Sequence, residues 1–103
     1  MDELDVTPLQ EALLLANLGH FDSALPEPLQ AHFTNLLRQA MLALRNDCNI
    51  DLDPENEEDA GLSAMYAAWL YRKSATGEAK PPMLQTAIRN RQSRQAKDRR
   101  ETE

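Results

Sequence analysis

The chain has 103 residues, a net charge of −6, 42% hydrophobic residues and a single cysteine. A chain of this length forms one domain at most and buries only a modest core. One cysteine excludes an internal disulfide framework, and no stretch reaches the roughly 20 apolar residues that a membrane-spanning helix needs.

The charge is distributed unevenly along the chain. Residues 1–60 hold 13 acidic and two basic residues, whereas residues 61–103 hold four acidic and nine basic residues. A split of this kind is typical of an interaction tail or of head-to-tail self-association.

The first two predicted helices lie in the acidic half. Thr7 before Pro8 indicates an N-cap, so the spacing predicts a helix over about 8–18 that Gly19 ends, followed by a proline-containing turn. The second helix, about 27–46, carries its apolar residues at helical spacing. These residues are Leu29, Phe33, Leu36, Leu37, Ala40, Met41 and Leu44.

The third predicted helix, about 57–74, begins with three acidic residues and ends before Thr76-Gly77. Its apolar stripe contains Tyr66 and Trp69, which we expect in the core. Tyr71 lies off that stripe on a helical wheel, so we expect its ring at the surface, where it would suit an interface.

The fourth predicted helix starts at Pro81-Pro82, and its large apolar residues stop at Ile88. We therefore predict an all-α fold: a small bundle of three to four helices with an extended basic C-terminal helix or tail. The predicted division is a helical body at 1–88 and a basic extension at 89–103, which projects from the body or is ordered by a partner.

Catalytic and cofactor sites are not predicted. Cys48 has no activating neighbour in sequence, and His20 and His32 form no metal-ligand spacing with it or with each other. The three scattered glycines form no phosphate-binding loop. We expect no enzyme activity, no cofactor and no metal.

The acidic loop after the second helix matches the calcium-binding loop of an EF-hand only in part. Asp51, Asp53 and Glu55 alternate as the first ligands of an EF-hand do, but Asn56 replaces the required glycine and Leu62 the closing glutamate. Two interpretations stay open: a solvated loop leading into a helix, or acids that meet a neighbour's basic surface. The candidate subunit-interface residues are Asp51, Asp53, Glu55, Glu57, Glu58, Asp59 and Tyr71.

The basic extension is the main candidate for partner binding. Three interpretations are open: docking to a protein partner, a solvated helix, or contact with nucleic acid, although no aromatic residue is present there for base stacking. Because these residues follow the apolar stripe, we expect replacement of the first three by glutamate to leave the fold nearly intact. The candidate residues are Arg89, Arg91, Arg94, Lys97, Arg99 and Arg100.

The stretches LALRNDCNI at 42–50 and MYAAWLYRKSATGEAKPPMLQTAIRNRQSRQ at 65–95 resemble head-to-tail connector proteins of tailed phages and prophages. The resemblance covers about half of the chain and includes the acidic loop between the two stretches. It does not extend to the first 25 residues.

The resemblance implies a structural role. Such connectors form rings of about a dozen copies beneath the portal protein, extend the DNA channel without sequence-specific binding, and offer a platform to the next tail or stopper protein. The family's extended segment contacts the portal, which would assign that role to residues 89–100. The expected location is the virion, assembled in the host cytoplasm, and the acidic first residues, which lack a signal-peptide pattern, agree with it. The alternative is a small nucleic-acid-binding regulator that uses the basic tail.

Overall fold

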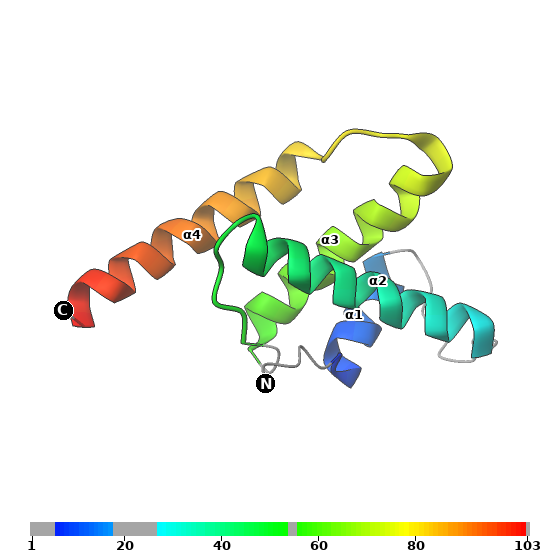
Figure 1. The fold of residues 1–103 in the computed structure, drawn as a ribbon, viewed down its shortest axis with the longest axis horizontal. Helices are drawn as coiled ribbons and strands as arrows, with labels where there is room; N and C mark the ends of the chain where they lie inside the picture. Colours follow the sequence, from blue (N-terminus) through cyan, green and yellow to red (C-terminus); the bar gives the residue numbers. More distant parts are fainter. Residues whose placement is uncertain (1–5, 18–26, 54–55, 103) are drawn as a thin grey trace.

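The protein is described by a computed structural model, which covers residues 6–17, 27–53 and 56–102. These residues form four α-helices and no strand, which confirms the predicted all-α fold (Figure 1). The predicted helix ranges agree with the observed ones to within two residues, while Gly19 and His20 lie outside the described residues. The helices are α1 (Pro8–Asn17), α2 (Glu27–Asn46), α3 (Glu57–Thr76) and α4 (Pro82–Thr102).

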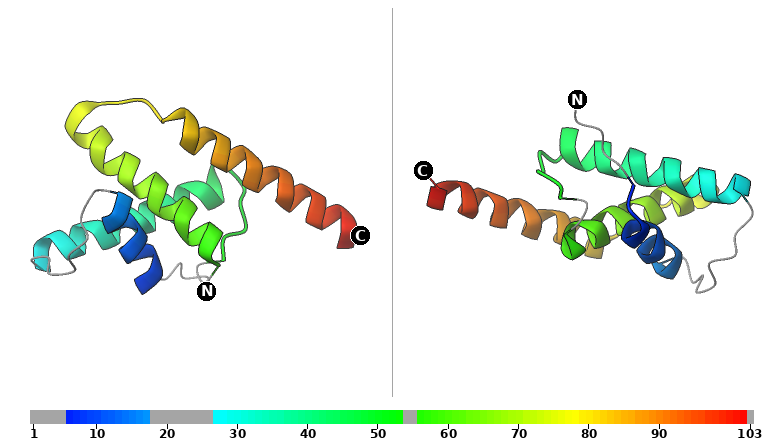
Figure 2. Two further views of the ribbon diagram at one scale, coloured as in Figure 1. Left: turned by 180° about the vertical axis from the view of Figure 1, so that it is seen from behind. Right: turned by 90° about the horizontal axis from the view of Figure 1, so that it is seen from below.

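The third helix is the centre of the fold, because it packs against each of the other three helices. In the left view of Figure 2, α3 lies between α1 and α4, and α2 crosses behind α3. The far end of α4 extends away from the other helices (Figure 1), and the molecule measures 48 × 29 × 24 Å.

The start of α1 is fixed by reciprocal capping. The Gln10 amide N–H donates to Thr7 Oγ1 at 3.2 Å, and the Thr7 amide N–H donates to Gln10 Oε1 at 2.9 Å. This is the capping box of a Thr-x-x-Gln sequence, and it satisfies a donor that the first helical turn would otherwise leave free. The Gln10 side chain is fully buried, and its Nε2 lies 3.1 Å from the sulfur of Met41, which links α1 to α2.

The core is formed where α1 and α2 meet α3. The described part of the predicted α2 stripe is buried, from Phe33 to Leu44, while the side chain of Leu29 is not described. Tyr66 and Trp69 are buried as predicted, with ring centroids 5.3 Å apart in an edge arrangement, and Trp69 Nε1 donates to the Glu78 carbonyl at 3.1 Å.

Both ends of α3 are capped. Asn56 Oδ1 accepts from the amides of Glu58 and Asp59 at 3.0 and 3.1 Å, and the acidic first turn suits the positive end of the helix dipole. At the other end Gly77 adopts φ 70° and donates its amide to the Lys73 carbonyl at 2.7 Å. A residue in this left-handed conformation is usually glycine, which explains why the helix ends here.

The connection from α2 to α3 is anchored into the core near its beginning. Asn49 adopts the left-handed conformation with φ 54°, and the next residue, Ile50, is fully buried. The Ile50 amide returns to the Leu44 carbonyl of α2 at 3.1 Å. This anchoring holds the backbone of residues 48–51 beside α4, where the candidate site begins.

Candidate docking surface

The contact stripe of α4 continues beyond its last large apolar residue. Leu84 and Ile88 are buried. Arg91 and Gln95 follow at the same spacing of three or four residues, so they lie on the same face of the helix. Gln95 is 9% exposed and Arg91 is partly buried. The predicted boundary between residues 88 and 89 therefore falls inside one continuous helix, and the residues just after it contact the body.

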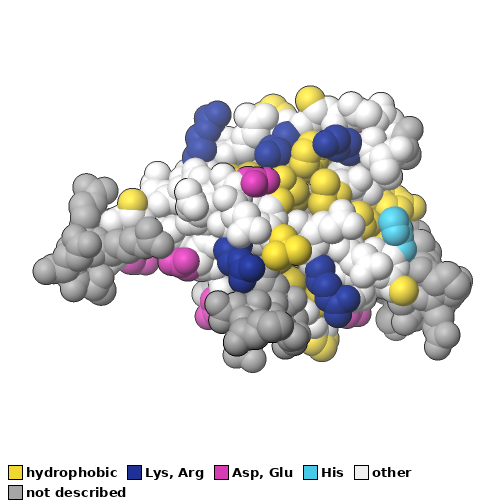
Figure 3. Space-filling view, in the orientation of Figure 1, with side chains coloured by type: hydrophobic (Ala, Val, Ile, Leu, Met, Phe, Trp, Pro, Cys, Tyr) yellow, Lys and Arg dark blue, Asp and Glu magenta, His cyan; other side chains and the backbone are white. Residues whose placement is uncertain are grey.

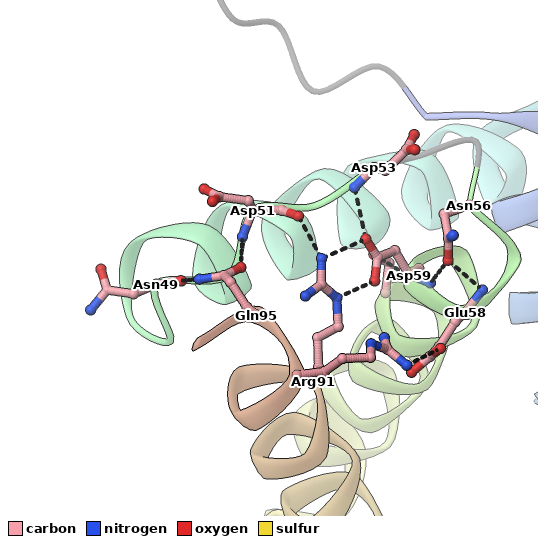
Figure 4. A network of polar contacts seen from close by, with 10 residues as sticks. Asn49, Asp51, Asp53, Asn56, Glu58, Asp59, Arg91 and Gln95 are labelled. Carbon is pink, nitrogen blue, oxygen red and sulfur yellow. Dashed lines mark hydrogen bonds and ion pairs between the residues drawn. The ribbon is translucent and has the colours of Figure 1, made fainter. Parts of the chain in front are cut away.

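A buried ion pair joins α4 to the start of α3 (Figure 4). Arg91 Nε lies 2.6 Å from Asp59 Oδ1, Arg91 Nη2 lies 3.2 Å from Oδ2, and the two side chains are only 13% and 3% exposed. Asp59 Oδ2 also accepts the Asp53 amide at 2.8 Å, and Arg91 Nη2 donates to the Asp51 carbonyl at 2.8 Å. The hydrogen bond to Asp59 raises the pKa of Arg91 above its ordinary value, so the guanidinium stays charged.

Two glutamines of α4 bind the backbone of the α2–α3 connection. Gln92 Nε2 donates to the Cys48 carbonyl at 2.8 Å, and Gln95 Nε2 donates to the Asn49 carbonyl at 2.7 Å. Gln95 Oε1 accepts the Asp51 amide at 2.6 Å (Figure 4). These contacts satisfy backbone groups that belong to no regular secondary structure, which ties α4 to the connection through hydrogen bonds.

The six predicted partner-binding residues have different surroundings. Arg91 is engaged by Asp59, and Arg94 Nη1 forms an exposed ion pair with Glu58 at 2.6 Å. Arg89 and Lys97 are exposed, and within the described residues neither has an ion-pair partner. The side chains of Arg99 and Arg100 are outside the description.

The expectation that glutamate at positions 89, 91 and 94 would leave the fold nearly intact assumed that all three residues lie outside the packed body. For Arg91 that assumption is wrong. Glutamate at position 91 would face Asp59 at a site where both side chains are largely buried. Two neighbouring carboxylates repel each other, and burial of an unpaired carboxylate is costly in free energy. Only Arg89 and Lys97 remain as described basic residues of this segment whose replacement changes charge without breaking an ion pair.

The predicted acidic interface residues also divide into two groups. Asp59 and Glu58 form ion pairs with arginines of the same chain, although Glu58 is exposed; Asp51, Asp53 and Glu57 are exposed as well, and no ion pair is described for Glu57. Glu55 lies outside the described residues. Asn56, which breaks the calcium pattern, is the N-cap of α3; an asparagine directly before a run of acids is a helix-start signal that could have revealed this role.

Tyr71 is half-buried, because its ring packs against α2. Its centroid lies 5.4 Å from that of Phe33 in an edge arrangement and 6.1 Å from that of His32. His32 itself is exposed. The ring of Tyr71 therefore forms the edge of the core and offers only part of its surface to a partner.

Cys48 lies after the end of α2 and is partly buried. Burial raises the pKa of its thiol above the ordinary value, Asp47 adds to the increase, and Lys80 opposes it. A thiol with a raised pKa is a poor nucleophile at neutral pH. Among the described residues, no group of three or more His, Cys, Asp or Glu side chains is placed to hold a metal ion.

Comparison with known proteins adds no family assignment. No family model matches the chain, and the searches of curated proteins and of solved structures found no match. Over the residues that the structure describes, no helix is long and apolar enough to cross a membrane.

Proposed function

We propose that the chain is a structural connector subunit, which assembles with copies of itself and docks to a portal ring through the far end of α4. The observation that carries the proposal is the change in α4 after Gln95: among the side chains whose burial is described, up to Asp98, Gln95 is the last buried one in this helix. After Gln95, α4 extends away from the body up to Thr102 (Figure 1).

The composition of this projecting part supports a protein partner. Residues 96–102 contain one alanine and otherwise only polar or charged residues, of which Lys97, Arg99 and Arg100 are basic and Asp98 and Glu101 are acidic. A helix of such polar composition gains little stability from its own chain, so a partner that contacts it stabilises it. Arginine is well suited to paired hydrogen bonds with carboxylates, which favours an acidic protein surface.

The alternative of a nucleic-acid-binding regulator loses part of its support. Arg91 and Arg94 are held by Asp59 and Glu58, so two of the six basic residues are already neutralised within the chain. Phosphate binding depends on the number of cations available, and fewer cations weaken it.

The proposal is tested by light scattering coupled to size exclusion, with the chain alone and with a tailed-phage portal ring. We expect a complex of defined stoichiometry, and we expect Lys97→Glu/Arg99→Glu/Arg100→Glu to abolish it without loss of helical signal. Arg38→Glu is the matched control, since it reverses an exposed cation on α2. A chain that stays monomeric and ignores the portal would overturn the proposal.

The same variants separate the two functions. If the chain instead binds duplex DNA with an affinity that falls steeply with salt, and the triple variant reduces that dependence, the regulator is the better account.

A further inference from the structure

Two hollows flank α4, one on each side of its contact stripe. The first, of about 400 Å³, lies between α4 and the end of α2 and is lined by Cys48, Lys80, Gln85, Ile88, Arg89 and Gln92. The second, of about 280 Å³, lies between α4 and α3 and is lined by Glu57, Glu58, Gly61, Leu62, Met65, Ala87, Asn90 and Arg91. At about 100° per residue, Ala87 and Asn90 lie on the opposite side of α4 from Gln85, Arg89 and Gln92.

The first hollow, here called the basic flank, has cations at its rim. Lys80 and Arg89 line it, and within the described residues neither forms an ion pair. Lys80 Nζ instead lies 5.2 Å from the ring centre of Tyr66 and 5.3 Å from that of Trp69. Lys73 Nζ lies 4.8 Å from the same ring centre of Trp69. Figure 3 shows Lys and Arg side chains, with acidic side chains among them, around exposed hydrophobic side chains on one face of the molecule. The charge of Asp47 also acts on Cys48 in the lining, so the two cations of this flank outnumber one nearby acid.

The second hollow, here called the acidic flank, has an apolar floor and an acidic rim. Leu62, Met65 and Ala87 supply the floor, and the nearby Met83 is 75% exposed on the same side of α4. Glu58 is neutralised by Arg94 and Arg91 by Asp59, which leaves Glu57 as the uncompensated charge of the lining.

The geometry points to a second copy of this chain as the occupant of both flanks: the acidic flank of one copy meets the basic flank of the next. Opposite charge on two sides of one helix favours this pairing, whereas a symmetric contact of either flank with itself would bring like charges together. Each copy then keeps one flank open for the next, which is the requirement for a ring or a filament. The inference rests on the proposed function, because it specifies how connector subunits would assemble.

Charge exchange tests the pairing. Arg89→Glu and Glu57→Arg, each made alone, should weaken self-association at low salt by roughly tenfold, as measured by sedimentation velocity. The double variant Glu57→Arg/Arg89→Glu should recover it, and so should an equimolar mixture of the two single variants. Arg38→Glu, an exposed charge reversal on neither flank, should have no comparable effect.

The outcomes distinguish this inference from the proposed function. Self-association that both single variants leave unchanged, or that neither the double variant nor the mixture restores, overturns the pairing while the connector role stands. Absence of self-association at any concentration, with or without the portal, overturns both. Circular dichroism on every variant identifies one that has lost its fold, and Lys80→Glu then replaces Arg89→Glu at the same rim.

Discussion

Removal of the Asp59 carboxylate tests how α4 is held to the body. Asp59→Ala deletes two contacts to Arg91, at 2.6 and 3.2 Å, and one to the Asp53 amide at 2.8 Å. Breaking a buried ion pair by removing one partner costs about 3–5 kcal/mol, because the remaining charge is left without compensation. The lower end, about 3 kcal/mol, applies because the Arg91 side chain retains 13% exposure and keeps its bond to the Asp51 carbonyl.

The assay is urea unfolding followed by circular dichroism and by the fluorescence of Trp69. For a domain of this size the urea slope is about 1–2 kcal/mol per M, so a loss of about 3 kcal/mol moves the midpoint by roughly 2 M. Glu57→Ala is the matched control, because it removes an exposed acid from the same first turn of α3 and reports only the helix-dipole contribution of about 0.3–1 kcal/mol. The reasoning is refuted if Asp59→Ala lowers the free energy of unfolding no more than Glu57→Ala does. It is also refuted if a double-mutant cycle of Asp59→Ala with Arg91→Met shows no coupling energy.

Three further predictions follow from the core, a cap and the free thiol. Trp69→Ala should cost about 3–5 kcal/mol in the free energy of unfolding, measured by urea denaturation, since the ring is 7% exposed. Gly77→Ala should cost about 1 kcal/mol in the same measurement, because the cost lies in the left-handed backbone: an added Cβ meets no atom within 4 Å. Cys48 should react with iodoacetamide more slowly than a free thiol at neutral pH. Because burial raises the pKa of Cys48, its thiolate forms at higher pH than in the unfolded chain. The alkylation rate should therefore rise only at pH values above the pKa of an ordinary thiol. An alkylation rate equal to that of the urea-unfolded chain would contradict this.

The helices were predictable because their signals are local. Apolar residues at helical spacing, the Thr7-Pro8 start and the Gly77 stop depend on neighbours within a few residues, and the observed ranges agree with them. The sulfur contact of Gln10 with Met41 depends on a residue 31 positions away and was not predicted.

The attachment of α4 was not predictable from hydrophobic periodicity. Arg91 and Gln95 occupy the positions where apolar residues would continue the stripe, but their partners are a carboxylate and backbone groups located 32 to 46 residues earlier in the chain. Such contacts leave no periodic apolar signal. The one available sign was the spacing itself, since Leu84, Ile88, Arg91 and Gln95 follow a single helical stripe. The docking role that the sequence suggested for all six basic residues is now proposed for Lys97, Arg99 and Arg100, with Arg89 proposed for contact between copies.

Hydrogen exchange along α4 tests the central claim most directly, because it compares the attached and projecting parts of one helix. In the free chain, amides up to Gln95 should exchange slowly, since that part is held by Leu84, Ile88 and Arg91, and amides of residues 97–102 should exchange much faster. In the complex with the portal ring, residues 97–102 should become protected while those up to Gln95 change little. Uniform protection of α4 in the free chain, or residues 97–102 that still exchange rapidly in the complex, would contradict the account.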